Sequence, residues 1–160
     1  LGADIPYCLM RGTALSEGIG EKLTALPPVP QCQVLIAKPG ISVSTKVVYE
    51  ALDAMELKPE QHPDIDGMIR AIREKDLHRV AGKFGNVLEL VTAGRYPVIG
   101  QIEQAMLECG AENAMMSGSG PTVFGIFEDR QTAKKAQRKI KELQIAKQVY
   151  LANVHNTKRR

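Results

Sequence analysis

A short glycine-rich segment, Ser117-Gly118-Ser119-Gly120-Pro121, contains the residue types that can bind a phosphate group. Apolar runs at 114–116 and 123–127 flank it, which predicts two strands joined by a tight loop. Glycines allow positive φ and leave backbone N–H groups uncovered. Successive uncovered amides form a concave anion site, so the loop could hold a phosphate or a developing negative charge. The alternative is a plain hairpin whose glycines serve the turn geometry alone.

A carboxylate near the amino end, Asp4, lies in the sequence Gly-Ala-Asp-Ile-Pro. An Asp beside glycine and proline usually closes a turn or caps a helix with its side chain. The alternative is a carboxylate that is held at a turn and pointed at a substrate hydroxyl.

A third candidate contact follows Pro39-Gly40, where Ser42, Ser44 and Thr45 open a predicted helix. The bare amides of a helix N-terminus, together with hydroxyl groups, could bind an anionic or polyhydroxy ligand. Capping by Ser42 or Ser44 explains most of this pattern. Thr45 is therefore the one residue here that we consider a candidate ligand contact.

The composition indicates a globular protein that handles small molecules. The chain has 160 residues, 44% hydrophobic and 24% charged, with a formal net charge of +3. Aromatic residues make up 4% and Trp is absent, which argues against a nucleic-acid partner. No apolar run is long enough for a membrane helix. The three cysteines favour reduced thiols in the cytoplasm, the three histidines lack metal-ligand spacing, and nothing indicates an oligomeric state.

The order of the predicted elements indicates an α+β fold. We expect an antiparallel sheet with helices on one side, in a split β-α-β plan with extra helices inserted in the first crossover. The proline cluster at 27–30 is stiff and marks a domain boundary. The expected strands are 7–10, 13–15, an extended return at 20–26, 33–38, the two strands of the hairpin, and 148–154. The expected helices are 44–57, a short one capped by Asp64, 77–91, one from Pro97 to Gly110, and 130–143, whose basic outer face is solvated.

Three segments, taken together and in order, resemble the GHMP superfamily of small-molecule kinases, which includes galactokinase, homoserine kinase and mevalonate kinase. They are Gly-Ala-Asp-Ile-Pro-Tyr-Cys at 2–8, Pro-Gly-Ile-Ser-Val-Ser-Thr at 39–45, and Met-Ser-Gly-Ser-Gly-Pro-Thr-Val-Phe-Gly at 116–125. The resemblance covers nearly the whole chain. Within the superfamily it is nearest to kinases of isoprenoid biosynthesis that act on a cytidine diphosphate conjugate of methylerythritol.

The resemblance implies a role for each candidate residue. Asp4 matches the catalytic aspartate that accepts the proton of the attacking hydroxyl, and Thr45 matches a position that lines the substrate pocket. Ser117, Gly118, Ser119 and Gly120 match the carboxyl-terminal glycine loop, which closes the active site near the phosphates. The implied cofactors are ATP and Mg²⁺, and the implied partner is a small-molecule substrate, the cytidine diphosphate conjugate.

The chain departs from the family pattern in one respect. The main ATP-phosphate loop and the catalytic lysine of these kinases have no counterpart in this sequence, which also begins at Leu1. We therefore expect residues 1–30 to end an ATP-binding domain, 31–154 to form the carboxyl-terminal domain, and 155–160 to be a basic tail. We also expect the 160 residues alone to be inactive. The alternatives are another GHMP kinase, acting on homoserine or mevalonate, and a non-catalytic ferredoxin-like module that binds an effector.

Overall fold

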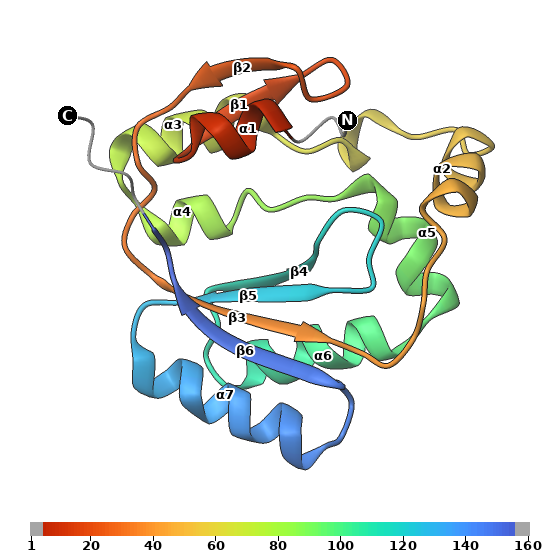
Figure 1. Ribbon diagram of the computed structural model, residues 1–160, viewed down its shortest axis with the longest axis vertical. Coiled ribbons are helices and arrows are strands. Elements are labelled where there is room, and N and C mark those ends of the chain that lie inside the picture. The colour runs from red at the N-terminus through yellow and green to blue at the C-terminus, as the bar shows by residue number, and fades with distance from the viewer. Residues whose placement is uncertain (1–4, 156–160) are drawn as a thin grey trace.

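The structure, a computed structural model, describes residues 5–155 and contains two antiparallel sheets surrounded by helices (Figure 1). Asp4 and residues 156–160 lie outside the described residues. The strands are β1 Ala14–Glu17, β2 Lys22–Ala25, β3 Gln33–Lys38, β4 Asn113–Met116, β5 Val123–Phe127 and β6 Gln148–Asn153. The α-helices are α1 Ile5–Met10, α2 Thr45–Asp53, α3 Ile65–Glu74, α4 Leu77–Ala81, α5 Val87–Arg95, α6 Val98–Glu108 and α7 Arg130–Glu142, with a short 3₁₀ turn η1 at Pro59–Gln61.

The main sheet has the strand order β4-β5-β3-β6, and every neighbouring pair in it is antiparallel. Five α-helices lie between β3 and β4, and α7 connects β5 to β6. This is the predicted split β-α-β plan with helices inserted in the first crossover, so the α+β prediction is confirmed. Contrary to the expectation, the helices do not all lie on one side, because Leu77 and Ala81 of α4 pack in a cluster with Val34 and Ile126 on the other face of the sheet. The strands β1 and β2 pair with each other in a separate two-stranded sheet.

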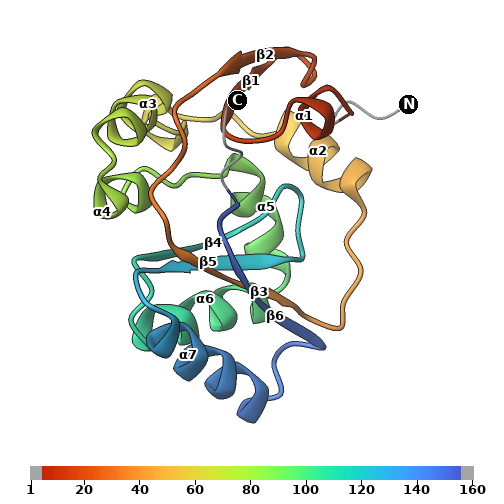
Figure 2. The same cartoon turned by 60° about the vertical axis from the view of Figure 1, so that its left-hand side comes forward.

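The core lies between one face of the main sheet and the helices α6 and α7 (Figures 1 and 2). The side chains of a strand alternate between the two faces of its sheet, so Leu35 and Ala37 of β3 point to the same side, and both are fully buried. On α6, Ile99 and Ile102 are fully buried against that face because their spacing places them on one side of the helix. The buried face fixes the register of β4 and β5, and therefore the position of the loop between them.

One strand prediction and one helix prediction were wrong. Residues 7–10 form the end of α1 rather than a strand, because Pro6 suits the first turn of a helix and Arg11 and Gly12 end it with positive φ. The predicted helix 77–91 is broken into α4 and α5, since glycines interrupt it and Asn86 caps a new helix. The helix that begins at Thr45 ends at Asp53, earlier than predicted, and the return at 20–26 contains β2.

Candidate active site

The segment 117–122 forms a tight loop between β4 and β5, and both views show it beside α5 and below α2 (Figures 1 and 2). The amide of Ser117 donates to the carbonyl of Thr122 at 2.8 Å, and Gly120 N donates to Ser117 O at 3.0 Å. Gly118 and Gly120 have φ of +57° and +83°, a region that favours glycine. The predicted hairpin with glycines at positive φ is therefore confirmed.

Helix α5 holds this loop from behind through two side chains that the sequence reasoning missed. Asn86 Nδ2 donates to the carbonyl oxygens of Met116 and Gly118 at 2.9 and 2.8 Å. The hydroxyl of Thr92, which is fully buried, lies 3.2 Å from the carbonyl of Ser119 and donates to it. Asn86 and Thr92 contact a loop that lies about 30 positions later in the chain, so no local sequence pattern reveals these contacts.

The hydroxyl groups of Thr45 and Ser119 lie 2.9 Å apart, in hydrogen-bonding distance. Thr45 is the first residue of α2, and the side chain of the N-cap residue Ser44 makes no capping hydrogen bond. The first turn of α2 carries no acidic residue, so nothing there opposes the partial positive charge of the helix N-terminus. The structure thus brings the candidate substrate contact and the glycine loop to one place.

Two consecutive amides of the loop are available to a ligand. Within residues 5–155, the N–H groups of Gly118 and Ser119 donate to no protein acceptor. Both residues lie at the surface, Gly118 exposed and Ser119 partly so. Adjacent amides of this kind are donors for phosphate oxygens, and a hydroxyl pair beside them supplies further polar contacts. The loop can therefore stabilise negative charge, whereas Asp4, the predicted proton acceptor, lies outside the described residues.

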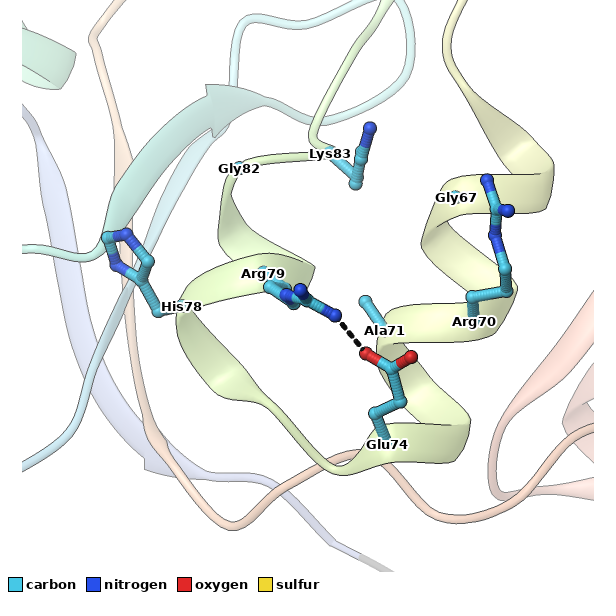
Figure 3. A pocket seen from close by; sticks show the side chains of 8 residues that line it. All are labelled: Gly67, Arg70, Ala71, Glu74, His78, Arg79, Gly82 and Lys83. Atoms are coloured by element: carbon cyan, nitrogen blue, oxygen red, sulfur yellow. Dashed lines mark hydrogen bonds and ion pairs between the residues drawn. The ribbon is translucent and has the colours of Figure 1, made fainter.

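A polar hollow of about 480 Å³ between α3 and α4 is a separate feature (Figure 3). Two of its basic groups have acidic partners: Arg79 pairs with Glu74, and Lys83 Nζ lies 2.6 Å from an oxygen of Asp64, whereas Arg70 makes no ion pair with a described residue. The Lys83 hydrogen bond is the main reason that the pKa of Asp64 lies below its usual value. Because Arg79 and Lys83 are already paired and none of the candidate residues lines this hollow, we do not place the active site here.

The described residues provide no cage for a metal ion and no membrane span. Between Ile5 and His155, no group of three or more His, Cys, Asp or Glu side chains could hold a metal. No helix in that range is both long and apolar enough to cross a membrane. Cys32 and Cys109 are buried, as expected for core thiols, and Cys8 is exposed.

Residues 63–146, more than half of the chain, match the family described as GHMP kinases C terminal. The chain belongs to this family. The GHMP match spans α3 to α7 and includes the glycine loop and both residues of α5 that hold it. The resemblance inferred from the three sequence segments is therefore confirmed.

Relatives and solved structures of GHMP kinases agree with this assignment. A 4-diphosphocytidyl-2-C-methyl-D-erythritol kinase of Lachnospira eligens is 61% identical over 94% of the chain and 51% of its own length. A crystal structure of 4-(cytidine 5'-diphospho)-2C-methyl-D-erythritol kinase superposes with a TM-score of 0.73, at 25% identity, over 95% of the chain and 53% of its own. Homoserine kinase from Cytophaga hutchinsonii also reaches 0.73, at 21% identity and covering 96% of the chain and 50% of its own, and shares the fold. The chain spans about half the length of the relatives that it matches.

Proposed function

We propose that these 160 residues form the carboxyl-terminal half of an ATP-dependent kinase that phosphorylates a hydroxyl of 4-diphosphocytidyl-2-C-methyl-D-erythritol in isoprenoid biosynthesis. The observation that carries the proposal is the contact between Thr45 and Ser119, because it joins the candidate substrate contact to the phosphate-binding loop. The name of the Lachnospira eligens relative supports the choice of substrate. Residues 1–30 would then end the ATP-binding domain and 31–154 form the second domain, which agrees with the separate sheets.

In the proposed reaction, the glycine loop binds phosphate, Thr45 orients the substrate and Asp4 accepts the proton. The free amides of Gly118 and Ser119 would hold phosphate oxygens of ATP, and the Thr45 hydroxyl would orient the substrate. Phosphoryl transfer depends mainly on such positioning and on charge stabilisation. A model Asp has a pKa of about 4, far below that of an alcohol, so Asp4 would accept the proton late, when the hydroxyl has become acidic through bonding to phosphorus. Mg²⁺ would accompany the nucleotide, and residues 5–155 offer no set of acidic ligands for it.

The proposed setting is the cytoplasm. ATP is abundant there, and three unpaired cysteines fit a reducing compartment. A nucleic acid or a membrane is not part of the proposed reaction, whose partners are ATP and a small-molecule acceptor.

The test is a kinase assay on a fusion protein. It joins the first half of the Lachnospira eligens relative to these 160 residues, and we call it the full-length chain. Radiolabelled ATP is supplied with the cytidine diphosphate conjugate, homoserine or mevalonate as acceptor. We expect label only on the conjugate, loss of turnover but not of ATP binding in Asp4→Asn, and no turnover by the 160 residues alone. Transfer to homoserine or mevalonate would instead support another GHMP kinase, and no transfer at all would support a non-catalytic module.

A further inference from the structure

Two glutamates from different helices meet behind the glycine loop, and neither has a role in the reaction described above. Glu89 lies in the first turn of α5, and Glu103 lies in the middle of α6. The Oε2 atom of Glu89 accepts a hydrogen bond of 2.9 Å from the amide of Met116, the last residue of β4. Met116 directly precedes Ser117, so this hydrogen bond fixes the point at which the loop begins.

The two carboxyl groups lie close enough that each affects the pKa of the other. Two neighbouring carboxyl groups can hydrogen-bond to each other only if one of them carries a proton. The Oε1 atom of Glu103 is buried, and no donor from residues 5–155 reaches it. A buried carboxylate oxygen without a donor is costly, whereas a protonated carboxyl group can donate to its neighbour.

Among residues 5–155, no cation forms an ion pair with Glu89 or Glu103. The strands β4 and β5 contain no titratable side chain, and α7 presents the apolar residues Ala133, Ala136 and Ile140 to the core that it shares with α6. On α2, which packs against α5, Lys46 and Glu50 are exposed and pair with each other at 3.7 Å. The nearby charge that acts on Glu103 is that of Glu89.

We propose that Glu89 and Glu103 share one proton and act as a positioning pair, in which protonated Glu103 holds the Glu89 carboxylate on the amide of Met116 and thereby fixes the base of the glycine loop. Loss of the shared proton places two like charges side by side and loosens the loop. The pair thus makes the order of the loop dependent on pH. Its consequence for catalysis rests on the proposed kinase function, but its effect on the loop does not.

The direction of the pH dependence follows from the pKa of Glu103. Burial, followed by the nearby charge of Glu89, raises this pKa from its ordinary value of 4.5 to about 7. At a pH between these two pKa values, Glu103 keeps its proton while the loop is closed and loses it when the segment opens. The closed state is therefore favoured below about pH 4.5 and loses this contribution as the pH rises through about 7.

The test is amide hydrogen exchange at Met116, expressed as a protection factor so that the intrinsic pH dependence of exchange is removed. If opening returns the pKa of Glu103 to its ordinary value, linkage predicts that protection falls about tenfold from pH 6 to pH 8. Glu103→Gln keeps a donor that carries no charge, so its protection should not change with pH. Glu108→Gln, on the exposed side of the same helix, is the matched control and should behave as the original protein does.

A second measurement does not depend on any variant. Carbon NMR of the side-chain carboxyl groups should show Glu103 titrating near pH 7, well above the exposed glutamates. Titration near 4.5, unchanged protection between pH 6 and pH 8, or the same pH dependence in Glu103→Gln would each overturn the proposal. A protein that passes these tests and still transfers no phosphate would contradict the kinase function and leave the shared proton intact.

Discussion

The hydroxyl oxygens of Thr45 and Ser119 lie 2.9 Å apart although 74 positions separate the two residues in the chain. One belongs to the N-terminus of α2 and the other to the loop between β4 and β5. Each of the two segments carries only a weak sequence pattern. The contact places them on one surface that carries hydroxyl groups and free amides. The predictions below concern the hydroxyl contact, the glycines of the loop, the helix that supports them, and an ion pair away from the site.

Replacing Thr45 by Val removes the hydroxyl group and keeps the branched shape of the side chain. We expect kcat/KM of the full-length chain to fall about tenfold, which corresponds to the loss of roughly 1 kcal/mol from one hydrogen bond. Thr45→Ser, which keeps the hydroxyl, is the matched control and should retain most of the activity. Equal activity in Thr45→Val and the original chain would remove Thr45 from the site.

The two loop glycines should respond differently to substitution by Ala. A Cβ at Gly118 would have no atom within 4 Å, so only the positive φ opposes it, at a cost of about 1 kcal/mol. A Cβ at Gly120 would come within 2.5 Å of Met116 Sδ, in addition to the strain of its φ of +83°. We expect Gly120→Ala to lower the free energy of unfolding by about 3 kcal/mol in denaturant titrations. Equal losses of unfolding free energy at the two positions would contradict the close contact between Gly120 and Met116.

Asn86→Asp separates the two tasks of Asn86. An Asp side chain can still cap α5 by accepting from Leu88 N, but it cannot donate to the carbonyl groups of Met116 and Gly118. We expect the free energy of unfolding to fall by about 2 kcal/mol, because these carbonyls lose their donor and face a carboxylate. The reverse exchange at the N-cap of α7, Asp129→Asn, is the control and should change the free energy of unfolding by less than about 1 kcal/mol. A small effect of Asn86→Asp would mean that the loop does not need this support.

His78 provides a prediction about pH. Its Nδ1 lies 2.9 Å from Glu112 Oε2, and this hydrogen bond is the main cause that raises the pKa of His78 above its ordinary value of 6.5. The raised pKa in the folded protein means that the pair is fully formed below pH 6.5 and is lost as the pH rises through the higher value. Proton NMR titration of Glu112→Gln should return the pKa of His78 towards 6.5, whereas Glu142→Gln should leave it raised. An unshifted titration in Glu112→Gln would contradict the pairing.

The sequence predicted the sheet and the hairpin because their signals are local. The continuous apolar run at 34–37 and the glycines between two apolar runs each specify one element from its own residues. The helices between Thr45 and Arg95 were predicted less well, since a continuous apolar stripe conceals the break at Gly82–Asn86, and Phe84 in that break still packs against the sheet. Local turn chemistry outweighed the apolar spacing there.

The candidate site was predicted only in part, for a physical reason. Thr45 and residues 117–120 carry recognisable patterns, namely a helix start and a glycine turn. The supporting residues Asn86, Thr92 and Glu89 act through contacts between residues distant in the sequence, and each alone resembles an ordinary helix residue. Such partners become visible only when the helices are placed against the loop. The position of Asp4 relative to the loop stays a prediction.

The most direct test of the central claim is whether Thr45 and the glycine loop respond to the same ligands. In the full-length chain, the amide resonances of Thr45, Gly118 and Ser119 can be followed during addition of a non-hydrolysable ATP analogue with the cytidine diphosphate conjugate. We expect the resonances of Gly118 and Ser119 to shift with the nucleotide, and that of Thr45 to shift with the conjugate at the same saturation. Resonances that stay unchanged at full occupancy would contradict a shared phosphoryl-transfer site.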